Sequence, residues 1–278
     1  MPRDDRHRRS IAGRVLWHGV LAGAALAMSF PVLWALITSF KPPGEVFSAA
    51  PFPVAPTIDN YAGVVANWPA MTLVVNTVVM SAGVALGQLV IATLAAFALV
   101  YVTPRVRPAI QLAAAVALVI PPQAIVIPQF LLATRLGWQN TDVGLIVPQL
   151  GASALAVLLL VQHVGAIPTS LCEAARLEGA RPWETLWHVV LPNLRPAIAA
   201  VGILVFISTW NEYLWPLLMA PRAEDATVQI GLSQFDTEGG IDYGALMAAA
   251  TLTSLPIAIV YAIASRRITD SFLQSGLK

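Results

Sequence analysis

The chain has 278 residues, of which 57% are hydrophobic and only 11% are charged. A mean hydropathy of +0.72 excludes an ordinary soluble domain, and a net charge of +1 gives no reason to expect nucleic-acid binding. The composition therefore predicts an integral membrane protein.

Six long apolar runs follow one another along the chain. A membrane-spanning helix needs about 20 mostly apolar residues, and the runs cover roughly 14 to 38, 73 to 101, 109 to 132, 143 to 166, 198 to 220 and 244 to 265. Each is expected to be a helix, because unpaired backbone groups are costly in lipid and the alternation of a membrane barrel is absent. The sequence thus predicts an all-α membrane domain over 14 to 265. Pro121, Pro122 and Pro128 should interrupt the third helix.

The basic residues are distributed unevenly between the two ends of these runs. Lys and Arg are retained on the cytoplasmic side more readily than they are translocated. With both termini inside, thirteen of them lie in the cytoplasm: Arg3, Arg6, Arg8, Arg9, Arg14, Arg105, Arg107, Arg176, Arg181, Arg195, Arg266, Arg267 and Lys278. Only Lys41, Arg135 and Arg222 lie outside. This bias predicts cytoplasmic tails over 1 to 13 and 266 to 278, a cytoplasmic loop over 167 to 197, and external loops over 39 to 72, 133 to 142 and 221 to 243.

The 167 to 197 loop has signals for two short helices. Ser170 with Glu173 three positions later forms a capping-box pattern, and Gly179 is suited to the left-handed conformation that closes a helix. Pro182 suits the first turn of a second helix, which should continue to Val190 before Pro192 stops it. Two such short amphipathic helices can dock into a groove on another protein or lie on the lipid headgroups, and the local sequence does not decide between these interpretations.

Polar residues in or beside the apolar runs are candidates for a solute pathway. A membrane-embedded charge is costly, so Glu212, beside Trp210, Asn211 and Tyr213, should face a cavity or a partner helix. Aromatic rings beside hydrogen-bonding groups suit a sugar, although an interfacial aromatic belt explains the rings equally well. Further candidates, which helix-to-helix hydrogen bonds would also explain, are Asn76, Gln88, Gln123 and Gln129.

Catalytic and metal-binding patterns are missing from the sequence. Cys172 is the only cysteine, the four histidines are scattered, and no GxxxxGK[ST] phosphate-binding loop occurs. We therefore expect a non-enzymatic chain with no cofactor or metal of its own. An ion-coupled secondary carrier is a second hypothesis, but it would often consist of two repeated halves, and no repeat is evident.

The loop over 167 to 197 resembles a known signature. Glu173, Ala174 and Ala175, then Gly179, Val189 and the Leu191–Pro192 pair have the order and spacing of the EAA motif of permease subunits of bacterial ABC importers, with Val where Ile is commoner. TSFKP at 38 to 42, IPPQAIVIPQF at 120 to 130, LGWQNTDVGLIVP at 136 to 148 and WNEYLWPLL at 210 to 218 resemble the carbohydrate-uptake branch, of which the inner permease of the maltose system is an example.

The resemblance implies a type I importer permease fold in a bacterial inner membrane. It also implies partners: a second permease in a heterodimer, two ATPases that bind ATP and Mg²⁺, and an extracytoplasmic solute-binding protein. The cargo implied is a di- or oligosaccharide, with glycerol 3-phosphate or a glycerophosphodiester as the alternative; an anionic solute would need cations, which these runs lack.

The resemblance assigns roles to two segments. The first is a coupling helix held in a cleft of one ATPase, with the candidate residues Glu173, Ala174, Ala175, Arg176, Glu178, Gly179, Leu191 and Pro192. The second is the 221 to 243 loop, which carries five acids and one base. It either contacts the binding protein through Gly231, Leu232, Gln234 and Phe235 or is a solvated connection.

Overall fold

The computed structural model describes residues 4–48, 50–237 and 240–276. It is helical apart from one short antiparallel pair of strands, β1 (Asp236–Thr237) and β2 (Gly240–Ile241). The chain forms two compact units. One contains the residues up to Trp68 together with Gln234–Leu252, and the other contains Pro69–Ser233 together with the residues from Thr253 onward.

The first unit contains α1 (Asp4–Thr38), η1 (Pro43–Glu45), α2 (Asp59–Asn67) and the start of α13 (Tyr243–Gly276). Its polar residues hold the chain segment that follows α1. Asn60 donates hydrogen bonds to the carbonyls of Ser39 at 2.8 Å and Lys41 at 2.9 Å. Lys41 is fully buried, donates to the carbonyl of Ala50 at 2.8 Å, and lies 5.1 Å from the centre of the Trp34 ring. These bonds fix the turn between α1 and α2.

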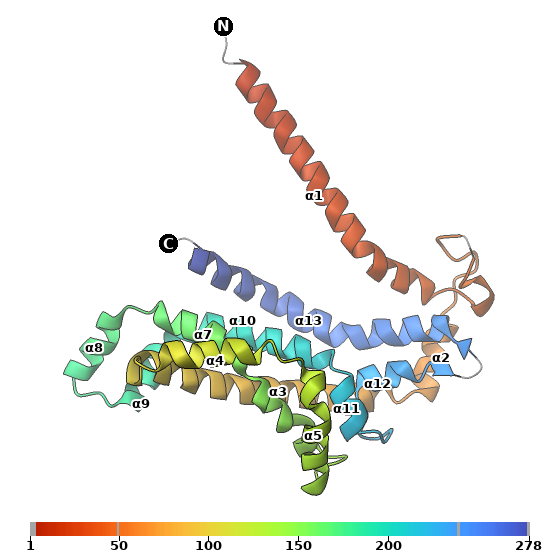
Figure 1. The fold of residues 1–278 in the computed structure, drawn as a ribbon. Coiled ribbons are helices and arrows are strands. Elements are labelled where there is room, and N and C mark those ends of the chain that lie inside the picture. Colours follow the sequence, from red (N-terminus) through yellow and green to blue (C-terminus); the bar gives the residue numbers. More distant parts are fainter. Residues whose placement is uncertain (1–3, 49, 238–239, 277–278) are drawn as a thin grey trace. The chain divides into compact units, whose positions relative to one another are not determined.

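The second unit is built around α3, α7 and α10, which pack on one another, with further helices at their ends (Figure 1). In chain order it contains α3 (Ala70–Phe97), the π-turn η2 (Ala98–Val102), α4 (Arg107–Ala117), α5 (Pro122–Arg135), α6 (Asp142–Ile146), η3 (Pro148–Ala152), α7 (Ala154–Gly165), α8 (Thr169–Leu177), α9 (Pro182–Thr185), the π-turn η4 (Leu186–Val190), α10 (Leu191–Trp210), α11 (Leu214–Met219) and α12 (Val228–Ser233).

The main core of this unit lies where α3, α7 and α10 meet. Small residues of α3 face larger aliphatic residues of the other two helices, so the helices approach closely. The buried side chains include Ala92, Ala96, Leu160, Val161, Val164, Leu194, Ala197 and Val201. Figure 1 shows α8 and α9 at one end of these helices, and α5, α11 and α12 at the opposite end.

Four described helices are long and apolar enough to cross a membrane: Gly13–Thr38, Ala70–Val102, Pro182–Trp210 and Tyr243–Ala262. Two bent pairs meet the same criteria together. They are α4 with α5, bent by 91°, and Asp142–Ala152 with α7, bent by 54°. Counting each pair as one span gives six among the described residues, in agreement with the six predicted runs.

The third and fourth spans are broken helices. The break between α4 and α5 precedes Pro122, as the prolines predict, because Pro121 is extended with φ −66° and ψ 135°. Pro128, in contrast, lies inside α5 and does not interrupt it. Of the three prolines, the first two mark the break.

The fifth span differs from its predicted limits of 198 to 220. It begins at Pro182 and ends at Trp210. The early start arises because Pro192 does not stop the helix. Leu191 has helical angles (φ −56°, ψ −45°), and the π-turn before it shifts the hydrogen-bond register, so a residue without an N–H is accommodated. These first turns were not predicted as part of the span because the polar residues Glu184, Thr185 and His188 interrupt their apolar residues. In the structure Leu186 and Val190 are buried.

Candidate functional site

The motif residues from Glu173 to Gly179 lie on α8 and in the turn after it, whereas Val189, Leu191 and Pro192 lie beyond α9, in η4 and α10. The ends of α8 and α9 are set by local chemistry. α8 begins at Thr169 after Pro168, with no side-chain cap. The predicted capping box of Ser170 and Glu173 is therefore wrong: Pro168, with φ −56° and ψ 126°, already directs the chain into the helix, and Ser170 lies inside its first turn. A side chain within the helix cannot serve as its N-cap.

The turn between the two helices follows the prediction. Gly179 has φ +88°, and the N–H of Ala180 bonds to the carbonyl of Ala175 at 2.9 Å, which closes α8. The carboxylate of Glu184 accepts the backbone N–H of Arg181 at 2.7 Å, so α9 starts at Pro182 as predicted. The helix, turn and helix are confirmed.

One side of this segment is exposed and partly apolar. Glu173 and Ala174 are exposed, as are Leu177 (90%), Trp183 (62%) and Trp187 (57%). The two indole rings stack at 5.9 Å between centroids. We name these five residues the α8–α9 surface. Large apolar side chains at such exposure, mixed with a carboxylate at the end of a helical bundle, are typical of an interaction site.

The opposite side of the segment is anchored in the core. Cys172 is 3% exposed, and it belongs to the cluster that also contains Val164 and Val190. Arg176 donates from Nη2 to the carbonyl oxygen of Tyr101 at 3.0 Å. Arg176, one of the predicted coupling residues, is exposed, but its guanidinium bonds to η2, the π-turn that continues α3 in this chain. Of the remaining predicted coupling residues, Ala175 and Leu191 are half-buried, whereas Glu178 and Pro192 are exposed.

Three of the four candidate pathway amides are hydrogen-bonded within the second unit. Asn76 donates to the carbonyls of Glu224 at 2.8 Å and Ala226 at 3.0 Å. Gln88 donates to Gln149 and Gln129 to Pro148, at 2.8 and 2.9 Å. Gln123 is exposed in the first turn of α5. The amides thus join elements that are distant in the sequence, and the four do not converge on one cavity.

The Trp210–Tyr213 block forms the junction between α10 and α11 and is not part of a helix interior. Trp210 is buried at 3% and Tyr213 is 42% exposed. Asn211 bonds back to the carbonyl of Ile207 at 2.8 Å, and the carboxylate of Glu212 accepts the N–H of Trp215 at 3.3 Å. The expectation that Glu212 lies within the fifth span is wrong, because α10 ends at Trp210. The side chain of Asn211 bonds back to the last turn of the helix at this end.

The predicted binding-protein loop, 221 to 243, contains the short helix α12. Gly231 is buried in α12 and Leu232 is half-buried, so Gly231 is not a tip residue. In the first unit, Gln234 is exposed and the ring of Phe235 lies 5.4 Å from that of Trp68. Residues 238 and 239 lie outside the described part of the chain.

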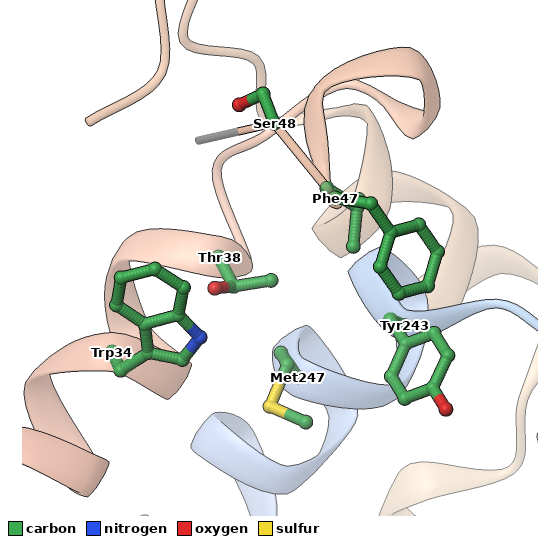
Figure 2. A pocket seen from close by; sticks show the side chains of 7 residues that line it. Trp34, Thr38, Phe47, Ser48, Tyr243 and Met247 are labelled. Carbon is green, nitrogen blue, oxygen red and sulfur yellow. The ribbon is translucent and has the colours of Figure 1, made fainter. Parts of the chain in front are cut away.

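A cavity of about 430 Å³ occurs in the first unit, and none of the predicted site residues lines it. Aromatic and aliphatic side chains form most of its wall, and Figure 2 shows Thr38 at its centre between Trp34 and Met247. The hydroxyl of Thr38 is buried without a hydrogen-bond partner. Within the described residues, no group of three or more His, Cys, Asp or Glu side chains is placed to hold a metal ion.

Sequence reasoning missed Tyr101. Its hydroxyl donates to the carbonyls of Val164 at 3.3 Å and Ile167 at 3.5 Å, and its own carbonyl accepts from Arg176. The residue lies at the end of an apolar run, where tyrosine commonly marks the membrane interface. Only the fold shows that this position meets α7 and α8.

Comparison with known proteins gives a consistent result. The family described as "Binding-protein-dependent transport system inner membrane component" matches residues 88–272. The lactose transport system permease protein LacG of Rhizobium radiobacter is 26% identical, over 94% of this chain and 95% of the relative. The trehalose/maltose transport system permease protein MalG of Thermococcus litoralis is 27% identical, over 98% and 99%. The sn-glycerol-3-phosphate transport system permease protein UgpE of Agrobacterium fabrum is 30% identical, over 94% and 96%.

The fold also has a counterpart among solved structures. A chain from the crystal structure of a bacterial ABC transporter involved in the import of the acidic polysaccharide alginate superposes with a TM-score of 0.76. The two chains are 23% identical, and the match covers 96% of this chain and 98% of the other. At this identity the likeness establishes the fold.

Proposed function

The chain belongs to the family of inner membrane components of binding-protein-dependent transport systems, and on this premise we propose that its α8–α9 surface docks a separate ATPase that drives transport. The observation that carries the proposal is the two-sided character of α8. Leu177 is 90% exposed on one side, whereas Cys172 is 3% exposed on the other. A helix anchored in a membrane core with an apolar outer face is suited to seating in a groove of a soluble partner.

The chemistry of ATP belongs to that partner in this proposal. The chain lacks the GxxxxGK[ST] loop that cradles phosphates, so ATP and Mg²⁺ bind to two ATPase subunits. ATP closes the ATPase pair, and α8 carries that motion into the membrane helices, which alternate between outward and inward access. Both termini and the α8–α9 surface face the cytoplasm, as the distribution of Lys and Arg supports.

A second permease completes the transport pathway. Support comes from α1, because none of its most hydropathic window is buried within this chain. Lipid and a partner permease would together cover this helix. On the external side, a solute-binding protein delivers the cargo, and the exposed Gln234 with the neighbouring Leu232 and Phe235 are the proposed contacts.

The proposed cargo is a di- or oligosaccharide. Relatives along nearly the whole chain are named for lactose, diacetylchitobiose, arabinooligosaccharides and trehalose/maltose. The second candidate is glycerol 3-phosphate, because two relatives named for it are 30% identical, whereas the sugar relatives are 26 to 28% identical. A phosphate would need cationic partners, and a sugar requires none.

Two measurements test the proposal. A tagged chain, purified from membranes of its native host, should bring with it one nucleotide-binding protein and one further permease. A deletion strain complemented with the chain should take up one labelled solute from a panel of lactose, maltose, trehalose, diacetylchitobiose and glycerol 3-phosphate. Uptake should fall to background in Glu173→Lys but not in Asp59→Lys, a matched charge reversal at an exposed position of α2. Uptake that continues after the co-purified ATPase is inactivated would contradict the proposal and favour an ion-coupled carrier.

A further inference from the structure

We propose that Tyr101 is a positioning residue that ties α8 to both α3 and α7, so that movement of the α8–α9 surface reaches two membrane helices together. This inference rests on the proposed function, since it explains how force from a docked ATPase would enter the bundle. Three independent contacts support it, all within the second unit.

The first contact joins α8 to α3. The guanidinium of Arg176 donates to the Tyr101 carbonyl at 3.0 Å. This carbonyl lies in the π-turn η2, which ends one residue later at Val102. Carbonyls in the last turn of a helix lack intrahelical donors and carry the negative end of the helix dipole. A cation from another element satisfies both conditions, so the position of Arg176 is favourable at this helix end.

The second contact joins α3 to α7. The Tyr101 hydroxyl donates to the carbonyls of Val164 and Ile167, at 3.3 and 3.5 Å. Val164 lies in the last turn of α7, and Ile167 is two residues before α8 begins. The Val164 carbonyl also accepts the backbone N–H of Ile167 at 3.2 Å, so the Tyr101 hydroxyl adds a second contact at this end of α7. The same side chain therefore holds the end of α7 and the approach to α8.

The third contact is apolar and prevents α8 from turning about its axis. Cys172 is buried with Val164 and Ile167 in the core cluster. The Tyr101 ring packs on Phe97 with 5.6 Å between centroids. Rotation of α8 would have to expose Cys172 and break the Arg176 bond at once. The segment therefore moves with α3 and α7 or must detach from both.

The single cysteine provides a direct readout of this attachment. We compare the rate at which N-ethylmaleimide modifies Cys172 in native membranes that contain the full-length chain. Arg176→Met removes the guanidinium and Tyr101→Phe removes the hydroxyl, and both variants retain most of the side-chain volume. Because the Tyr101 hydroxyl also interacts with the Cys172 thiol, Arg176→Met is the deciding variant. Each should raise the rate by about two- to tenfold, the effect of losing one hydrogen bond. Arg195→Met, an exposed arginine of α10, should leave the rate unchanged. Wild-type rates of Cys172 modification in both test variants would contradict the attachment of α8 through Tyr101.

A second readout separates positioning from docking. In the native host, Arg176→Met should co-purify the ATPase at the wild-type level, and the purified assembly should hydrolyse ATP, while uptake per ATP hydrolysed falls by a similar factor. Loss of ATPase co-purification in Arg176→Met would show that Arg176 contacts the partner, and would overturn its assignment to Tyr101. If wild-type chain co-purifies no ATPase, the proposed function fails, whereas the maleimide result still decides whether the attachment exists.

Discussion

The side-chain amide of Gln88, near the middle of α3, donates a hydrogen bond to the carbonyl oxygen of Gln149 at 2.8 Å. Gln88 is only 7% exposed, and Gln149 lies in η3, within the pair of helices that is bent by 54°. Regular helical hydrogen bonding is interrupted at such a bend, and a buried amide can satisfy a main-chain carbonyl there. The hydrogen bond therefore joins the broken fourth span to the continuous helix α3.

Replacing Gln88 by Leu should therefore destabilise the bundle. Hydrogen bonds between membrane helices contribute about 0.6 to 2 kcal/mol, and the loss should appear as a lower unfolding midpoint in detergent. Gln123→Leu, at an exposed position, is the control. Equal midpoints for the two variants would mean that the bond between Gln88 and Gln149 contributes nothing measurable.

Gly144 is a position where even one methyl group should be harmful. A Cβ there would overlap the backbone carbonyl of Trp138 and lie 2.6 Å from the Met219 side chain, and a backbone atom cannot move aside easily. Gly144→Ala should cost about 1 to 3 kcal/mol through overpacking and should reduce the amount of folded chain in the membrane. Gly151→Ala has no atom within 4 Å of the new methyl and should behave as wild type. Similar yields of both variants would contradict the tight packing of α6.

The spans could be predicted from the sequence more reliably than their ends. Apolar runs of sufficient length identified each span, because lipid allows few alternatives to helix. The beginning of the fifth span could not be read in this way. Polar residues such as Glu184, Thr185 and His188 interrupt the apolar residues of these first turns, and Pro192 suggested a stop, although the helix continues through it after the preceding π-turn. Hydropathy and the usual effect of proline do not predict the shift in hydrogen-bond register that a π-turn introduces.

The candidate site was predictable where its chemistry is local. The left-handed Gly179 and the start of α9 at Pro182 depend on neighbouring residues only. The partner of Arg176 is Tyr101, 75 residues away, and no local pattern indicates such a pair. The roles of the site residues in transport stay predictions.

The left-handed turn itself leads to a further prediction. Gly179 has φ +88° with open space around it, so Gly179→Ala adds conformational strain without a clash. The expected cost is about 1 to 2 kcal/mol, paid by the turn that sets α9 against α8. Uptake in the complemented strain should fall, and Gly179→Asn should retain more activity, because asparagine adopts this conformation more readily. The opposite order, with Ala above Asn, would show that φ at residue 179 does not limit the turn.

Photocrosslinking at residue 177 tests whether the α8–α9 surface docks an ATPase. Leu177, exposed at 90%, is replaced by a benzophenone amino acid in the full-length chain, and native membranes are irradiated. We expect one dominant adduct with a nucleotide-binding protein, and no such adduct from the same probe at Val54, which is 83% exposed in the predicted external loop. Absence of a nucleotide-binding protein among the residue 177 adducts, or its capture at residue 54 alone, would contradict the account.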